Sequence, residues 1–449
     1  MHFASYFSRC SSLFFLFCLA NGYCLAQFNL SGTVIDRAKG TPVEAVHVFL
    51  ENTTLGTLTD EQGRYEFKEI PNGVYKLIVS HLAYNTVDMT VRTPRRTPYI
   101  LDFKLFPSSI DLSAVEVTSK KSRKRNRYLK EFTSAILGNT PNGAKCRLLN
   151  PEQVLLQKEA DGRLTASAKG ILKFENKSTG YITYFLLEDF ASINNQISYA
   201  GKTFFEALES SDPKEARRWA KNRKVTFQGS VRHFYLSLMQ NRLTQDGFEI
   251  YKAKLQDNKK FVTTGRVDPK QLIKQNGDNY QLQFDDFLKV VYTREGEIDH
   301  AGSRRIGRSA KQLSQRAESD LVDQESGSLG QKRKKQTSWL FARKSKIDIS
   351  PEGFPTKPGS VVEYGYWNEE GLADFLPLEY SPKAATIVAA TDVPAEEQPA
   401  PERNGFQLTQ LKIPLADIQS GGPPRDGIPS IDRPSFIGAS DIGNVLRKD

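Results

Sequence analysis

Hydrophobic and polar residues alternate in short runs over the part of the chain that follows the amino-terminal stretch. Alternation with a period of two, interrupted by turn residues, is typical of half-buried strands. The pattern predicts a compact antiparallel β-sandwich over residues 27–118. The predicted strands are Leu30–Ile35, Val43–Leu50, Tyr65–Phe67, Val74–Val79 and Ile100–Leu105.

Two turns of this sandwich have a clear local chemistry. In Asp60-Glu61-Gln62-Gly63 the carboxylate of Asp60 can accept backbone N–H groups, and Gly63 can adopt a positive φ. Pro71-Asn72-Gly73 predicts the next turn by the same chemistry. Neither turn carries a residue pattern that indicates catalysis.

Several of these turns also agree, in order, with a known family. The matching residues are Gly32–Asp36, Pro42–Val46, Gly56–Tyr65 and Ile70–Tyr75. On these residues the segment resembles the carboxypeptidase-regulatory-like, transthyretin-like β-sandwich, which in Bacteroidetes-type bacteria stands at the amino terminus of outer-membrane receptors and other envelope proteins. The resemblance implies an accessory domain rather than an active site.

From residue 131 to 300 the pattern changes to longer strands and two amphipathic helices, which predicts an α+β domain with a mixed sheet. Asp212 and Pro213 open a helix that runs to about Lys224, because Asp is a favoured N-cap and Pro is tolerated in the first turn. Ser230 caps a second helix, Val231–Met239. The predicted strands are Leu164–Ala168, Ile171–Phe174, Tyr181–Leu187, Phe248–Lys252 and Tyr280–Tyr292.

This second region contains several further motifs: Lys221-Asn222-Arg223, Gly229–Phe234, Asn241-Arg242-Leu243, Gly365-Tyr366-Trp367 and Ala373–Tyr380. On these residues it is similar to an uncharacterised region that often follows the regulatory-like sandwich in Bacteroidetes envelope proteins. That family has no established activity that the resemblance could imply.

Other segments have a biased composition. The basic run Lys120–Arg127 predicts a solvated linker over 119–130. Residues 301–337 are polar and predict a disordered insertion before the end of the second domain at 338–383. Residues 384–449 predict a disordered Pro/Ala-rich tail. Within this tail, Pro414–Asp432 resembles the opening of another bacterial domain of unknown function. The segment would be either a degenerate remnant of that domain or a short docking motif.

The first 26 residues predict an export signal. Arg9 precedes the apolar run Leu13–Leu19, and Cys24-Leu25-Ala26 fits a cleavage site before Gln27. The run is too short for a good membrane span, and the residues before Cys18 and Cys24 do not fit a lipoprotein signal. These features predict a soluble exported protein. Cleavage would leave Cys146 as the single cysteine, so no intramolecular disulfide is expected.

The net charge of +10 favours anionic partners, and export disfavours nucleic acid among them. The helix from Pro213 carries a predicted basic face, because its cations recur at helical spacing while Trp219 can anchor the opposite side. The face fits an acidic protein or an anionic glycolipid, and the alternative is an ordinary solvated surface. Its members are Lys214, Arg217, Arg218, Lys221 and Lys224.

Candidate catalytic groups are few. A catalytic zinc needs three protein ligands, and the histidines show no zinc-binding spacing, so neither a metal nor a cofactor is expected. His233 in the second helix is a weak candidate general base without an accompanying nucleophile motif. The acid pairs Glu188-Asp189 and Asp285-Asp286 are interpreted as solvated strand ends. The five histidines are His2, His47, His81, His233 and His300.

The sequence thus favours a non-enzymatic cell-envelope protein, periplasmic or bound at the outer membrane. It would act as an accessory module for a protein or polysaccharide partner, such as an outer-membrane receptor. One alternative is an unrecognised hydrolase that uses His233 and an acid in the middle domain. Another is a eukaryotic secreted protein glycosylated at Asn29, Asn52 and Asn176.

Overall fold

The computed structural model describes residues 28–93, 99–108, 123–193, 196–256, 260–277, 279–296, 335–357, 359–382 and 408–412. The predicted signal, most of the predicted insertion and the 414–432 motif lie outside these residues. The chain divides into two compact units. The first contains Met1–Phe49 and Leu55–Ser108, and the second contains Leu50–Thr54 and Ser109–Asp449.

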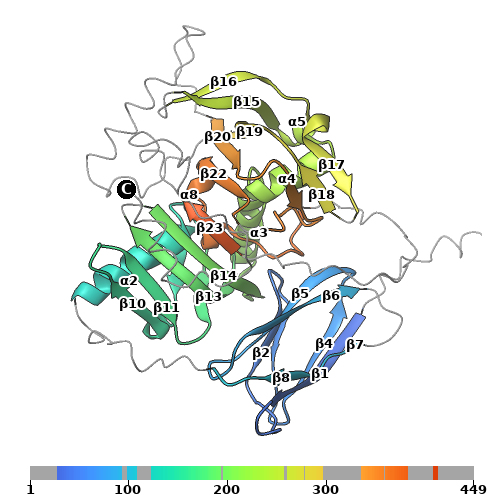
Figure 1. The fold of residues 1–449 in the computed structure, drawn as a ribbon, viewed down its shortest axis with the longest axis vertical. Coiled ribbons are helices and arrows are strands. Elements are labelled where there is room, and N and C mark those ends of the chain that lie inside the picture. The colour runs from blue at the N-terminus through green and yellow to red at the C-terminus, as the bar shows by residue number, and fades with distance from the viewer. Residues whose placement is uncertain are drawn as a thin grey trace, which may run out of the picture. The chain divides into compact units, whose positions relative to one another are not determined.

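The first unit is a β-sandwich of two sheets (Figure 1). One sheet has the strand order β4-β1-β7 with β8 also paired to β1, and the other has the order β3-β2-β5-β6. β1 is antiparallel to β4 but parallel to β7 and β8, so the predicted antiparallel sandwich has one parallel side. The strands are β1 Phe28–Asp36, β2 His47–Leu50, β3 Gly56–Leu58, β4 Arg64–Ile70, β5 Gly73–Ser80, β6 Val87–Thr93, β7 Tyr99–Ile100 and β8 Phe103–Leu105.

Two predicted strands of the sandwich are shorter than expected, for local reasons. The run Ile100–Leu105 is split because Asp102 turns its carboxylate to the backbone N–H of Thr33 at 2.8 Å and to the Thr33 hydroxyl at 2.7 Å. The run Val43–Leu50 becomes a strand only at His47, because Ala45 has a φ of 57°. A positive φ removes a residue from the extended ladder.

The two predicted turns differ in outcome. Asp60 accepts the backbone N–H groups of Gln62 and Arg64, and Gly63 has a φ of 70°, as predicted. Gly73 instead begins β5, and the nearest residue with a positive φ is Glu69, at 61°, which lies within β4 where its register with β1 shifts. The sequence therefore gives the position of the second turn but not its geometry.

The second unit contains two larger sheets and one small one (Figure 1). The first large sheet has the order β10-β11-β13-β12-β9, with β14 paired to both β13 and β23. The described strand pairs of this unit are antiparallel, where a mixed sheet was predicted. Its strands are β9 Cys146–Leu148, β10 Val154–Lys158, β11 Leu164–Ala168, β12 Leu172–Asn176, β13 Tyr181–Ile193, β14 Gln196–Ala207 and β23 Leu408–Lys412.

Helix α2, Arg123–Leu137, packs against this first sheet. Residues 123–130 were predicted as linker, yet they form its first turns. The reason lies at the other end of the helix, where Phe132 and Ile136 are fully buried among Phe174, Phe185 and other sheet residues. This apolar anchor stabilises a helix whose exposed first half is strongly basic.

The second large sheet has the order β16-β15-β19-β20-β22, and a small sheet has the order β17-β18-β21. Helix α4 buries Phe234, Tyr235 and Leu238 in the core that these sheets share. Residues 335–337 of the predicted insertion belong to β20, and β23 lies in the predicted tail. The strands are β15 Phe248–Gln256, β16 Lys260–Arg266, β17 Ile273–Asn276, β18 Asn279–Leu282, β19 Phe287–Gly296, β20 Lys335–Ala342, β21 Ile347–Ile349 and β22 Val361–Gly365.

The two predicted helices are present with their predicted caps. α3 spans Pro213–Phe227 behind the Asp212 N-cap, and α4 spans Val231–Met239 behind the Ser230 N-cap. Together with the sheets they give a mainly β protein with a few helices in its middle region. The short helices are α5 Leu243–Asp246, α6 Pro269–Leu272, α8 Tyr366–Glu369, η1 Gly143–Lys145, η2 Pro151–Gln153 and η3 Leu372–Asp374.

Candidate functional site

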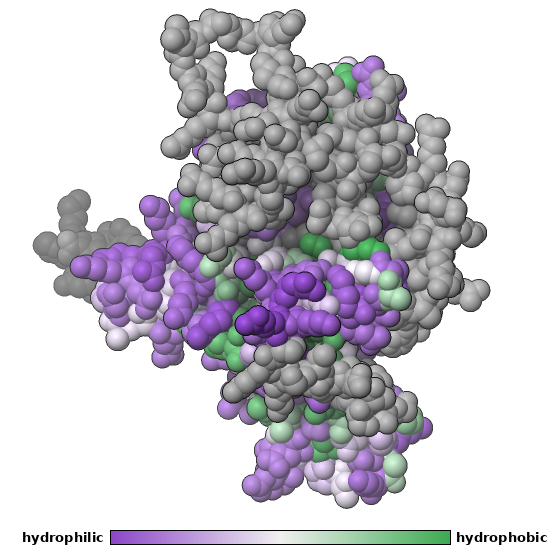
Figure 2. Space-filling model, turned by 90° about the vertical axis from the view of Figure 1, so that its left-hand side faces the viewer, coloured by the Kyte–Doolittle hydropathy of each residue, from purple (hydrophilic) through white to green (hydrophobic). Residues whose placement is uncertain are grey.

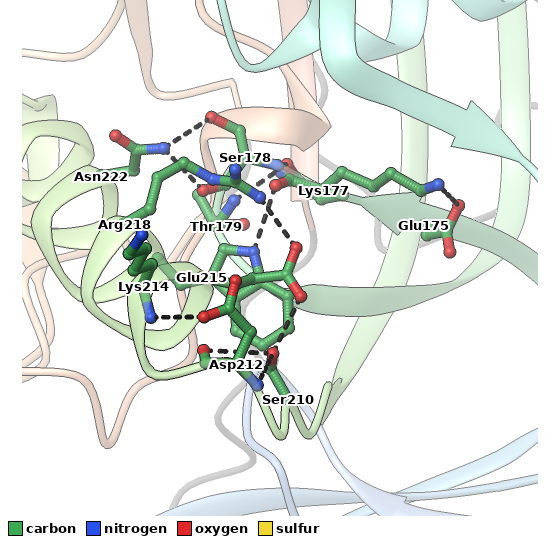
Figure 3. Close-up of polar contacts among 12 residues, drawn as sticks. Glu175, Lys177, Ser178, Thr179, Ser210, Asp212, Lys214, Glu215, Arg218 and Asn222 are labelled. Carbon is green, nitrogen blue, oxygen red and sulfur yellow. Dashed lines mark hydrogen bonds and ion pairs between the residues drawn. The ribbon is translucent and has the colours of Figure 1, made fainter.

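The first turn of α3 is fixed by its own polar residues. The Asp212 carboxylate accepts the backbone N–H of Lys214 at 2.8 Å, and the Ser210 hydroxyl donates to Glu215 at 2.9 Å. Glu215 in turn pairs with Arg218 at 2.8 Å (Figure 3). Acidic groups at this end also complement the helix dipole. The helix therefore begins at a defined residue, which fixes the direction of every side chain after it.

The inner side of α3 binds a row of backbone carbonyls in the turn between β12 and β13. Trp219 Nε1 donates to the carbonyl of Lys177 at 3.2 Å. Asn222 Nδ2 donates to that of Ser178 at 2.8 Å (Figure 3). Arg223 donates from Nε to the carbonyl of Thr179 at 2.6 Å and from a terminal nitrogen to that of Gly180 at 2.9 Å. Because four successive carbonyls are bound, the helix cannot rotate about its axis.

This attachment directs the predicted cations outward. At 100° per residue, all five lie within an arc of about 120°, opposite Trp219 and Phe227. All five are exposed, whereas Trp219 and Phe227 are buried. The structure therefore brings together the five predicted residues on one surface, hereafter the α3 basic face: Lys214, Arg217, Arg218, Lys221 and Lys224.

The α3 basic face is largely without compensating acids. Within the described part of the chain, Arg218 pairs with Glu215, and the other four cations have no ion pair. Lys177 adds a further ammonium at the turn below the helix, where it is 66% exposed and 3.9 Å from Glu175. Linear spacing could not have linked Lys177 to α3, because the hydrogen bond from Trp219 that joins them spans 42 positions. The described surface seen in Figure 2 is mainly hydrophilic, with small separate hydrophobic areas.

His233, the candidate base, is buried in the second unit. Its Nδ1 accepts the backbone N–H of Gly229 at 3.1 Å, and its ring packs against Phe227 and Phe248. Burial lowers the pKa of His233 to about 4, although Asp246 lies 4.0 Å from Nε2. The imidazole is therefore neutral near pH 7, and its acceptor nitrogen is already used by the backbone.

A serine and an acid lie near His233, but not in the order that nucleophilic catalysis needs. In a catalytic triad the serine hydroxyl donates to the histidine, and the acid binds the far side of the ring. Here Ser237 Oγ donates to Asp246 at 2.8 Å, and Asp246 also binds Arg242 at 3.1 Å. Ser237 is 1% exposed. The group serves packing between α4 and α5.

The residues that carried the second resemblance meet in the core. Trp367 Nε1 donates to the carbonyl of Gly229 at 2.7 Å, and its ring lies 5.5 Å from that of Phe234. Arg232 donates to the carbonyls of Pro377 at 3.1 Å and Leu378 at 2.8 Å. Burial lowers the pKa of Arg232 to about 10, so it stays charged at neutral pH. These motifs are distant in sequence but form one structural unit.

Comparison with known proteins identifies the first unit. Residues 30–117 match the family of the CarboxypepD_reg-like domain. This confirms the resemblance of the sandwich, and the CarboxypepD_reg-like domain covers a minor part of the chain. No curated protein is significantly similar to the chain.

Three solved structures illustrate how limited the wider similarity is. The major pilin subunit BcpA of Bacillus cereus is 15% identical, with 18% of this chain and 30% of that one covered and a TM-score of 0.16. The 5-hydroxyisourate hydrolase of Klebsiella pneumoniae is 22% identical, with 18% and 85% covered and a TM-score of 0.15. A Bacteroides uniformis protein described as carbohydrate-binding is 12% identical, with 34% and 56% covered and a TM-score of 0.16. The chain thus spans less than a third of the pilin subunit.

The CarboxypepD_reg-like domain contains two of the histidines, His47 and His81. His81 Nδ1 accepts the backbone N–H of Ala83 at 3.1 Å, and its pKa is lowered by burial. His47 lies on β2, and His2 and His300 lie outside the described residues. Within the described ranges, no group of three or more His, Cys, Asp or Glu side chains could hold a metal ion.

The two acid pairs, Glu188-Asp189 and Asp285-Asp286, lie in different surroundings. Glu188 binds the buried Lys202 across the sheet, next to an irregularity of β13, and burial raises the pKa of Asp189. Asp285 and Asp286 are exposed in a turn, where Asp286 lies 3.7 Å from Lys254. Glu188 is exposed as predicted, but it lies within β13 rather than at a strand end, and it pairs with Lys202.

The remaining sequence candidates have structural roles. Asn176 is 2% exposed and donates to the carbonyl of Ala373, and Asn52 is 7% exposed, so neither suits a glycan. Cys146 is half-buried, and burial raises the pKa of its thiol to about 12. Over the described residues, no helix is both long and apolar enough to cross a membrane.

Proposed function

We propose that the protein is a non-enzymatic, exported accessory protein of the cell envelope, which binds an acidic protein or polysaccharide at the outer membrane. The CarboxypepD_reg-like domain supports an envelope setting, because the resemblance associates such domains with envelope proteins. The binding surface in this proposal is the α3 basic face. No cofactor, metal or nucleic acid takes part.

One observation carries the proposal. Four cations, Lys214, Arg217, Lys221 and Lys224, are exposed on a helix whose orientation is fixed, and they have no ion pair within the described residues. Clustered charge of one sign raises the local potential and accelerates association with an oppositely charged partner. Fixed orientation reduces the ordering cost of binding. The face is therefore suited to recognise a negatively charged partner rather than to perform chemistry.

The test is in-cell crosslinking of the tagged full chain, followed by identification of what co-purifies from the envelope fraction. The variant changes Lys214, Arg217, Lys221 and Lys224 to Gln, which keeps good helix formers on α3. The matched control changes four exposed lysines elsewhere to Gln and removes the same charge. These are Lys104, Lys252, Lys270 and Lys274.

We expect the α3 variant to lose the acidic partner and the control to keep it. Purified full chain should also bind polygalacturonate but not neutral dextran, with about tenfold weaker binding in the α3 variant. Rising salt should reduce the binding, because exposed charges are screened beyond about 8 Å at physiological ionic strength. Equal recovery of the same partners by both variants would refute the role of the α3 basic face.

A further inference from the structure

Helix α2 carries a second basic surface, which the proposed function leaves unused. The helix contains five cations and a single acid, Glu131. That acid is already paired, because its carboxylate lies 3.6 Å from the ammonium of Lys158. The exposed cations of α2 have no ion pair within the described part of the chain. They are Arg123, Lys124, Arg127 and Lys130, hereafter the α2 basic face.

The inner side of α2 fixes the direction of this face. Phe132 and Ile136 are fully buried against the first large sheet, where α2 packs beside β10 (Figure 1). On the same side of the helix, Arg125 donates to the carbonyl of Pro151 at 2.8 Å and to that of Val154 at 3.2 Å. The helix is therefore held by apolar packing toward one end and by a guanidinium toward the other, so its opposite side faces solvent.

Three cations of the α2 basic face form one straight row. At 100° per residue, Arg123, Arg127 and Lys130 lie within an arc of about 60°, opposite Phe132. Along the helix axis, successive members of the row are about 6 Å and about 4.5 Å apart. These cations point the same way from a convex surface, so they do not converge on a single ion. They can instead meet several anions that lie in one plane.

The remaining exposed residues of α2 leave that plane accessible. They are Asn126 and Ser134, which are short and uncharged. The helix exposes neither an acid that would repel anions nor a large apolar side chain that would enter hydrocarbon. Two of the four cations are arginines, whose guanidinium can bind phosphate oxygens through two parallel N–H groups. A cluster of about four or more Lys and Arg on an amphipathic helix is typical of proteins that bind anionic lipids.

We propose that the α2 basic face docks on the anionic phosphate headgroups of a membrane surface, without insertion into the hydrocarbon. Each Lys or Arg near such a surface increases the affinity about fivefold. The binding is reversible and weakened by salt, because exposed charges are screened. The α2 and α3 basic faces are attached to different parts of the second unit, so this inference does not rest on the proposed function.

The first experiment measures sedimentation of the full chain with vesicles of phosphatidylcholine and phosphatidylglycerol in equal parts, and with pure phosphatidylcholine vesicles. The matched control is the α3 variant described above, which removes the same charge. We expect the α2 variant to bind the mixed vesicles on the order of 100-fold more weakly than the parent, and the α3 variant almost as tightly as the parent. No form should bind pure phosphatidylcholine. The α2 variant, which keeps good helix formers, carries Arg123→Gln, Lys124→Gln, Arg127→Gln and Lys130→Gln.

A second experiment leaves the α2 basic face unchanged and locates the contact. Ser134→Cys lies on the line of the row, and Lys274→Cys lies on β17, on an exposed residue of the same unit. Each is made with every native cysteine changed to Ser and carries a fluorophore. We expect lipids with a spin-labelled headgroup to quench the fluorophore at position 134 in mixed vesicles, but not the one at position 274.

Equal weakening in the α2 and α3 variants, or equal quenching at the two positions, would overturn the proposal, because binding would then follow net charge. Absence of binding to mixed vesicles by the parent would also overturn it. So would an α2 variant that keeps vesicle binding but loses polygalacturonate, because the face would then serve a polysaccharide. Polygalacturonate binding by the α3 variant tests the α3 basic face separately.

Discussion

At the scale of single residues, Gly180 decides whether α3 can attach to the sheet. Its φ is 69°, and a Cβ built there would lie 2.3 Å from Trp219 Cδ2. Gly162 also has a positive φ, of 85°, but a Cβ added there would meet only open space. The two glycines therefore separate backbone strain from close packing.

We expect Gly180→Ala to lower the free energy of unfolding by about 3 kcal/mol, and Gly162→Ala by about 1 kcal/mol. Both alanines adopt an unfavourable left-handed conformation, but only the first displaces an indole. Chemical denaturation followed by tryptophan fluorescence measures both. Equal losses in the two variants would show that Gly180 acts through its backbone alone.

His233 predicts a pH dependence of stability. Its pKa is lowered to about 4 in the folded chain, against about 6.5 when unfolded. The unfolded state therefore takes up the proton more readily, so this stabilisation is complete above pH 6.5 and is lost as the pH falls toward 4. The loss is up to about 3 kcal/mol. Denaturation between pH 7 and 4 should show it in the parent chain, and a His233→Asn variant should show a flatter profile.

At the scale of elements, α3 and α4 could be predicted from the sequence because their caps are local. Asp212-Pro213 and Ser230 supply hydrogen bonds within the first turn, and such signals need no tertiary partner. α2 could not be predicted in the same way. Its first half is basic with no acid in the first turn, and the residues that stabilise it are buried against strands that follow it.

Arg223 tests how α3 is held. Its guanidinium binds two successive carbonyls and lies 4.0 Å from the centre of the Tyr181 ring, a geometry that an ammonium cannot reproduce. Arg223→Lys should therefore cost about 2 kcal/mol of unfolding free energy. Arg217→Lys, the same change on the exposed side of the helix, should be neutral within about 0.5 kcal/mol. Similar losses in both variants would contradict the carbonyl-binding role.

At the scale of the whole molecule, the sequence predicted the α3 basic face but not its setting. Helical spacing alone places Lys214, Arg217 and Lys221 on one side of a helix. Trp219 also indicated the buried side, but the carbonyl row of residues 177–180 that fixes the helix is a long-range contact and could not be predicted. The same holds for Arg232, whose partners Pro377 and Leu378 lie over 140 positions away. These long-range hydrogen bonds give the motif residue Arg232 a role in packing.

The thiols of the chain connect the predicted export with the fold. Of four cysteines, Cys10, Cys18 and Cys24 lie in the predicted signal, so chain purified from the envelope should show one thiol in denaturant. That thiol, Cys146, has its pKa raised to about 12 by burial, which leaves little thiolate at pH 8. Native chain should therefore react with a thiol reagent on the order of 100-fold more slowly than unfolded chain. Four thiols in denaturant would contradict cleavage after Ala26. Fast labelling of the native chain would instead contradict the burial of Cys146. A thiol titration of native and unfolded chain therefore tests the two predictions separately.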